Sequence, residues 1–310
     1  MEIPHRKRSQ PFENGSSAMK AGFVNIIGNP NVGKSTLMNA LVGEKLSIVT
    51  AKAQTTRHRI MGIVNGDDYQ IVYSDTPGIL KPAYELQRSM LDFVDTAIGD
   101  ADIILYVTDV IEKKDKNAAY VEKLSKLECP VIIVINKIDI SDQQTVCDLM
   151  SQWQELVPDA VIFPASAQEK FNLDNIFDTI VAKLPESPAW FDREQFTDKS
   201  LRFFASEIIR EKILENYTKE IPYCAEVVVE SFRESSERYD ISAIINVMRD
   251  SQKGIIIGKN GATLKKVATA ARIDMEKFFE KKVFLQVYVK VEPGWRENRK
   301  MLKKYGYILD

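Results

Sequence analysis

The segment Gly28–Ser35 constrains the fold of this chain more than any other part of the sequence. It reads GNPNVGKS, which matches the pattern GxxxxGK[ST] of a phosphate-binding loop. An apolar run at Gly22–Ile27 precedes it, and an amphipathic run at Lys34–Val42 follows. In such a loop, backbone N–H groups surround phosphates at the positive end of a helix dipole. A strand, a phosphate loop and a helix are therefore expected in that order, and a plain glycine-rich turn is the weaker alternative.

Short β-branched runs alternate with amphipathic segments along the first part of the chain. The further runs expected to be strands are Ile60–Val64, Tyr69–Ser74, Asp102–Thr108, Val131–Ile135 and Ala160–Phe163. The further segments expected to be helices are Tyr84–Ile98, Lys116–Leu127, Asp142–Leu156 and Leu173–Leu184. Because apolar strands alternate with helices, they predict an α/β fold with a mostly parallel, doubly wound sheet. The turn sequence Asn65–Asp68 joins two strands as a hairpin and adds one antiparallel edge strand.

A second, smaller α+β domain is expected after the break at Leu184–Pro188. The polar stretch at 185–200 is predicted to be a linker. Residues 201–310 then follow the order helix, strand, strand, helix, helix, strand, and a basic helix at Trp295–Tyr305 ends the chain. This second unit is too small to be another nucleotide-binding fold.

The first residues, the apolar runs and the cysteines of the chain indicate a soluble, cytoplasmic class of protein. Residues 1–18 are polar and lack the apolar core of a signal peptide, so they predict a disordered tail before a first domain at 19–184. No apolar run approaches the roughly 18–20 residues that cross a bilayer. The 3 cysteines are far apart and form no CxxC pair, which favours reduced thiols in a cytoplasmic protein.

Two later motifs identify the base that the phosphate loop serves. Asp75–Gly78 reads DTPG and Asn136–Asp139 reads NKID, and each follows an apolar run. The carboxylate of Asp139 can accept from both N1–H and N2–H₂ of guanine, which is a pair of donors that adenine cannot offer. Lys137 is placed to cover the plane of the base. Three motifs in order at strand ends predict a GTP/GDP site that uses Mg²⁺.

Individual residues of this site have expected roles. Lys34 is predicted to reach the β- and γ-phosphates, and the N–H of Gly78 to sense the γ-phosphate. Mg²⁺ ligands are predicted to be Ser35, Thr56 and Asp75, the last one through water. Thr56 is preferred over Thr55 in a switch loop between the first helix and the second strand, with a plain surface loop as the alternative. The predicted catalytic residues are Lys34, Thr56 and Gly78. The predicted nucleotide contacts are Asn29, Asn31, Val32, Gly33, Lys34, Ser35, Thr36, Asp75, Gly78, Asn136, Lys137, Asp139, Ser166 and Ala167.

One side chain that Ras-like enzymes use is missing. Ile79 stands where those enzymes place a glutamine that orients the attacking water. Hydrolysis should therefore be slow unless another group, a cation or a partner stabilises the reaction. The amide oxygen of Asn31 is a candidate ligand for K⁺ beside the phosphates, and a structural hydrogen bond across the loop is an equal alternative.

The end of the chain is basic, whereas the rest is acidic. Residues 251–310 hold 14 Lys and Arg against 6 Asp and Glu, a net charge of +8, and the whole chain carries −2, which leaves −10 on residues 1–250. The segment Gly258–Gly261 reads GKNG; this GxxG spacing is weak evidence alone, but here it lies between an apolar run and a helix. In KH domains such a loop clamps single-stranded nucleic acid. The predicted RNA contacts are Gly258, Lys259, Asn260, Gly261 and Lys265, and a solvated lysine-rich face is the alternative.

These motifs together resemble a known family. Gly28–Ser35, Gln54–Arg59, Asp75–Gly78, Asn136–Asp139 and Gly258–Gly261, followed by Gly294-Trp295 and Gly306-Tyr307, resemble those of the bacterial Era GTPases, in the TrmE-Era-EngA-YihA-like superfamily. The resemblance covers nearly all of the chain after residue 18. It implies a GTPase domain joined to a type II KH domain that binds the 3′ end of 16S rRNA. It also implies a role in assembly and maturation of the small (30S) ribosomal subunit, and a hydrophobic residue at the position of Ile79 is shared by the family.

Other functions stay open at this stage. One is a non-enzymatic, GTP-sensing RNA-binding scaffold, and another is a different ribosome-assembly or tRNA-modification GTPase of the same superfamily. The basic terminal helix also fits weak peripheral association with the inner face of the cell membrane. A monomer is expected.

Overall fold

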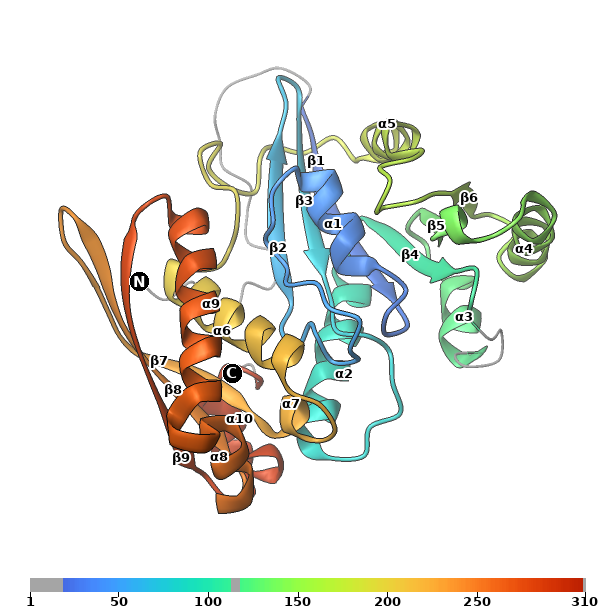
Figure 1. Cartoon of the computed structure of the whole chain (residues 1–310). Helices are drawn as coiled ribbons and strands as arrows, with labels where there is room; N and C mark the ends of the chain where they lie inside the picture. Colours follow the sequence, from blue (N-terminus) through green and yellow to red (C-terminus); the bar gives the residue numbers. More distant parts are fainter. Residues whose placement is uncertain (1–18, 113–117, 309–310) are drawn as a thin grey trace.

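The computed structural model of this protein describes residues 19–112 and 118–308 (Figure 1). The predicted tail at 1–18 lies outside the described residues.

The first half of the chain forms a six-stranded sheet in the order β2-β3-β1-β4-β5-β6. Its strands are β1 (Lys20–Gly28), β2 (Ile60–Asn65), β3 (Tyr69–Asp75), β4 (Ile103–Asp109), β5 (Val131–Asn136) and β6 (Val161–Pro164). All neighbouring strands are parallel except β2, which pairs antiparallel with β3. The predicted sheet and its antiparallel edge strand are therefore confirmed.

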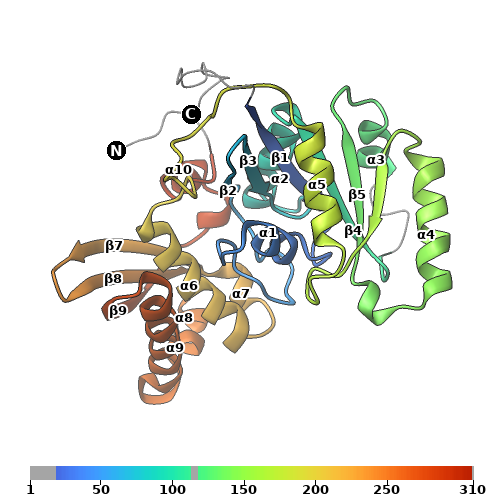
Figure 2. The ribbon, with the colours of Figure 1, turned by 90° about the horizontal axis from the view of Figure 1, so that it is seen from above.

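Helices cover both faces of this sheet. They are α1 (Lys34–Val42), α2 (Glu85–Gly99), α3 (Ala118–Leu124), α4 (Gln143–Leu156) and α5 (Leu173–Lys183). Residues of α1 and α5 share one apolar core with the sheet, whereas α2, α3 and α4 contribute to a second core (Figure 2). Parallel strands buried on both faces place their carboxyl ends at one edge, where ligands of such folds bind.

The second half forms a three-stranded sheet in the order β7-β8-β9. Its strands are β7 (Glu226–Glu234), β8 (Arg238–Val247) and β9 (Lys282–Val291), and its helices are α6 (Leu201–Asn216), α7 (Ile221–Cys224), α8 (Asp250–Ile257) and α9 (Ala262–Phe279). Strands β7 and β8 are antiparallel, and β8 and β9 are parallel. Residues of α6 and α9 pack on the sheet in a separate apolar core. The predicted element order is confirmed, with the one-turn helix α7 added.

The end of the chain is not one continuous helix. A 3₁₀ turn at Trp295–Glu297 and the helix α10 (Arg299–Lys304) replace the helix predicted at Trp295–Tyr305. The break occurs at Asn298, because its side chain accepts from the backbone N–H groups of Lys300 and Met301 and so begins a new helix. Trp295, Leu302 and Tyr307 are buried against α2, which brings α10 between the two sheets (Figure 2).

The segment between the two sheets lies along strand β2. The N–H of Ile63 donates to the carbonyl of Phe196 at 2.9 Å, and the N–H of Met61 donates to Asp198 Oδ1 at 2.9 Å. Thr197 forms an isolated bridge with Gly62. The segment thus covers the β2 edge of the first sheet. None of the helices within 19–112 and 118–308 is long and apolar enough to span a membrane.

Candidate nucleotide and RNA sites

The phosphate loop connects β1 to α1 and is fixed to the base-recognition motif. Gly33 has a φ of 96°, and a Cβ there would lie 2.2 Å from Asn136 Nδ2, so only glycine fits. The Asn136 amide donates to the carbonyl of Val32 at 2.8 Å and accepts from the N–H of Ala167 at 2.9 Å. One buried side chain therefore holds three of the predicted nucleotide-binding segments together.

The ammonium of Lys34 lies inside this loop. Its Nζ donates to the carbonyls of Gly28 at 3.1 Å and Asn29 at 2.8 Å. Burial lowers the pKa of Lys34 to about 8, while nearby Asp75 and Glu112 oppose that shift. A phosphate beside Lys34 would favour its charged form, so the group is poised to bind an anion.

The three predicted Mg²⁺ ligands converge in the structure. Ser35 Oγ donates to Asp75 Oδ2 at 2.6 Å and lies 2.8 Å from Thr56 Oγ1, which is 3.2 Å from Asp75 Oδ2. Burial raises the pKa of Asp75, although Lys34 offsets part of this effect. Asp75 Oδ1 is buried and has no hydrogen-bond partner among the described residues. This set of hard oxygen atoms with one unpaired carboxylate oxygen fits Mg²⁺, which binds few protein ligands and keeps several waters.

The base-recognition residues lie beside the same loop. Lys137 has a φ of 62°, and its Nζ contacts the carbonyl of Asn31 at 2.5 Å and Asp109 Oδ2 at 2.7 Å. Asp139 is exposed in a short 3₁₀ turn, while Ser166 and Ala167 are buried after β6. Sequence reasoning missed Asp109; the signal was a carboxylate at the end of β4, next to the strand that precedes Lys137.

A cleft of about 380 Å³ joins the phosphate loop to the predicted switch loop. Its lining residues are Pro30, Asn31, Gly33, Lys34, Ser35, Thr36, Ile48, Val49, Thr50, Ala51, Lys52, Gln54, Thr55, Thr56, Gly78 and Lys137. Ile79 is only 3% exposed and belongs to an apolar core. Its side chain therefore contributes to packing and cannot orient a water for attack.

The GxxG loop connects α8 to α9 in the second domain. Gly258 has φ 71° and ψ 177°, a conformation that is nearly restricted to glycine, and a Cβ there would lie 2.1 Å from Thr263 Oγ1. Lys259, Asn260 and Lys265 are exposed around the loop. This arrangement lets a sugar-phosphate chain approach the backbone with positive charge at hand.

Comparisons with known proteins identify both domains. Residues 23–137 match the family model described as 50S ribosome-binding GTPase, and residues 220–296 match the KH domain model. GTPase Era of Clostridium kluyveri is 43% identical over 291 residues, which cover 93% of this chain and 99% of the relative. GTPase Era of Syntrophus aciditrophicus is 44% identical over 297 residues, which cover 94% of this chain and 97% of the relative.

Two solved structures resemble this chain over nearly its whole length. A crystal structure of Era in complex with MgGDPNP and nucleotides 1506–1542 of 16S ribosomal RNA is 38% identical and has a TM-score of 0.90, covering 94% of this chain and 100% of that one. A variant of Era from Aquifex aeolicus bound to GDP·AlF₄⁻ gives the same values. The chain therefore belongs to the Era family of GTPases.

Proposed function

We propose that this GTPase binds the 3′ end of 16S rRNA through residues 201–310 and assists assembly of the small ribosomal subunit. The observation that carries the proposal is that one chain combines a phosphate loop, at which Ser35, Thr56 and Asp75 converge, with a GxxG loop on a basic domain. The similarity to Era bound to nucleotides 1506–1542 of 16S ribosomal RNA supports this choice of RNA. The predicted contacts are Gly258, Lys259, Asn260, Gly261 and Lys265.

In the nucleotide site, the proposed roles follow the chemistry of phosphoryl transfer. Lys34 stabilises negative charge on the β- and γ-phosphates, and the N–H of Gly78 meets the γ-phosphate. Ser35, Thr56 and Asp75 hold Mg²⁺, which supplies neutralisation of phosphate charge when it is bound. The Asp139 carboxylate selects guanine.

RNA affinity is expected to depend on the bound nucleotide. With GDPNP, the protein should bind a 16S rRNA fragment containing nucleotides 1506–1542 about tenfold more tightly than with GDP, a coupling of ordinary size between two sites. Fluorescence anisotropy of labelled RNA at fixed salt measures this difference. A scrambled RNA of equal length is the control, because phosphate attraction alone binds both sequences. Equal affinities with both nucleotides would contradict control by GTP, and equal affinities for both RNAs would contradict the proposed target.

K⁺ is proposed as a second cation, bound through the side chain of Asn31. Asn31 lines the cleft and is exposed with a φ of 66°, and its side chain makes no hydrogen bond within the described residues. GTP hydrolysis should be about tenfold faster in K⁺ than in Na⁺, because a cation beside the phosphates stabilises developing charge. Asn31→Ala should remove that difference. Equal rates of the unaltered protein in the two salts would refute the idea.

We propose that this protein is a monomer and that helix α10 does not bind the membrane surface. The basic helix α10 uses Leu302 to pack against α2, so this apolar side chain is not free to enter a lipid surface. An amphipathic membrane helix needs an apolar face in addition to its positive charge. Sedimentation with and without anionic vesicles tests both points.

A further inference from the structure

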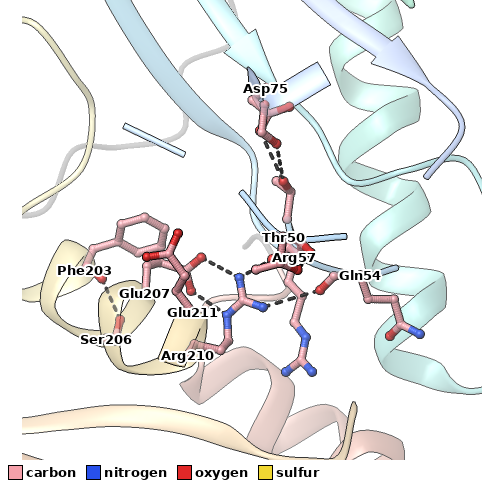
Figure 3. Close-up of polar contacts among 12 residues, drawn as sticks. Thr50, Gln54, Arg57, Asp75, Phe203, Ser206, Glu207, Arg210 and Glu211 are labelled. Carbon is pink, nitrogen blue, oxygen red and sulfur yellow. Dashed lines mark hydrogen bonds and ion pairs between the residues drawn. The ribbon is translucent and has the colours of Figure 1, made fainter. Parts of the chain in front are cut away.

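The switch loop, defined here as residues 44–59, lies against helix α6, which packs on the second sheet (Figure 3). Lys45 forms an ion pair with Glu211 of α6 at 2.9 Å, and the N–H of Val49 donates to the same carboxylate at 3.3 Å. Lys52 Nζ donates to the carbonyls of Leu214 and Tyr217. The loop that is predicted to respond to GTP is therefore bonded along its length to the domain that carries the GxxG loop.

Arg210 of α6 contacts the two residues that directly precede Thr56. Its guanidinium is held by Glu207, with Nε–Oε1 at 2.8 Å and Nη2–Oε2 at 2.6 Å. From this fixed position it donates through Nη1 to the carbonyl of Gln54 at 3.4 Å and through Nη2 to the carbonyl of Thr55. Figure 3 shows the guanidinium between Glu207 and the loop backbone. Arg210 is only 1% exposed, and although burial opposes its charge, Glu207 keeps its pKa above the usual value.

Arg57 holds the other side of Thr56. Its Nη1 donates to the carbonyl of Ala225 at 2.9 Å and to Glu226 Oε2 at 3.1 Å, and its Nη2 donates to the carbonyl of Pro222 at 2.9 Å. Glu226 also accepts from the hydroxyl of Tyr307 at 2.7 Å. Thr56 thus stands between two backbone positions that the KH domain fixes, and its hydroxyl meets Ser35 and Asp75.

We propose that Arg210 is a positioning residue for GTP binding: by holding the carbonyls of Gln54 and Thr55 it keeps Thr56 at the Mg²⁺ site. The inference rests on the proposed role of Thr56 as a Mg²⁺ ligand. Glu207 keeps the guanidinium in place whether the loop is near or not, so α6 presents its donors without reorganisation. A loop that leaves gives up two charge-assisted hydrogen bonds. The RNA-binding half of the chain thereby favours the loop conformation that binds GTP.

The test compares the affinities for GDPNP and for GDP of the full chain carrying Arg210→Gln. GDPNP affinity at a given Mg²⁺ concentration should fall about tenfold, as expected for loss of hydrogen bonds to a charged group, while GDP affinity should change little. Titration with fluorescent nucleotides over a range of Mg²⁺ concentrations measures both quantities. Arg202→Gln is the matched control, because Arg202 lies on the same helix but is exposed. Equal losses for GDPNP and GDP would overturn the proposal, since they would indicate damage to the fold alone.

Thr56→Ala separates failure of this inference from failure of the proposed site. If Thr56→Ala lowers the affinity for GDPNP and Arg210→Gln does not, Arg210 has no positioning role, but the proposed role of Thr56 at the Mg²⁺ site is supported. If neither changes GDPNP affinity, the role of Thr56 is wrong, and the inference falls with it. If Arg210 acts through Thr56, the double variant should lose no more affinity than Thr56→Ala alone.

A second variant distinguishes loss of positioning from loss of the fold. Arg210→Gln leaves Glu207 buried without its partner, which can unfold a protein. Arg210→Met combined with Glu207→Gln removes both charges together and should preserve the thermal unfolding midpoint. It is expected to show the same selective loss of GDPNP affinity, and an unaltered ratio of GDPNP to GDP affinity would overturn the proposal.

Discussion

Asp139→Asn is expected to lower the affinity for GTP by about a thousandfold and to create affinity for XTP. The carboxylate offers two acceptors to N1–H and N2–H₂ of guanine. The asparagine amide keeps one acceptor but places its NH₂ group opposite N2–H₂ of guanine. Two hydrogen-bond donors then face each other, and neither has an acceptor. Xanthine carries a carbonyl at that position and restores the match.

Competition binding of GTP and XTP against a fluorescent nucleotide measures this switch. Asp142→Asn is a suitable control, because Asp142 is the nearby N-cap of α4 and asparagine caps helices equally well. The control should retain its preference for GTP. A variant Asp139→Asn that still prefers GTP over XTP would show that another group reads the base.

Gly258→Asp is expected to weaken RNA binding by about a hundredfold while leaving GTP binding intact. The new Cβ would overlap Thr263 Oγ1 at 2.1 Å in a backbone conformation that is nearly restricted to glycine. The loop must therefore move, and the added carboxylate also repels phosphate. Both effects act where the backbone is proposed to touch the RNA.

Gly254→Asp distinguishes the loop geometry from simple charge. Gly254 lies in α8 one turn earlier, and a Cβ there meets nothing within 4 Å. This control adds the same negative charge without forcing the loop to move. If Gly254→Asp reduces RNA affinity as much as Gly258→Asp does, the attraction is electrostatic and the GxxG loop does not act as a clamp.

The parts of this protein that local sequence determines were predictable. Gly28–Ser35 specifies a strand end, a turn and a helix start within one short segment, and α1 has the predicted bounds Lys34–Val42. The helix expected after the GxxG loop is also present: α9 begins directly after that loop at Ala262 and ends at Phe279. In both cases, turn residues and apolar periodicity lie next to each other in the chain.

Contacts between distant segments were not predictable in the same way. Nothing local to Arg57 indicates that Glu226 is its partner, because the two are 169 residues apart. Charged residues also occur mostly at the surface, so Arg210 in an amphipathic helix suggests solvent and not a buried contact with a switch loop. The break at Trp295–Tyr305 has a local cause instead: Asn298 lies within a segment of helical composition, and its side chain caps a second helix.

The segment that lies along β2 also determines how freely the two halves of the chain can separate. Because Phe196, Thr197 and Asp198 are bonded to the strand, little chain remains between the first sheet and the start of α6 at Leu201. A short connection of this kind keeps the two partners at a high effective concentration. Individually modest hydrogen bonds from α6 can therefore hold the switch loop reversibly. After the loop leaves α6, the same bonds can form again quickly, because the two segments stay close together.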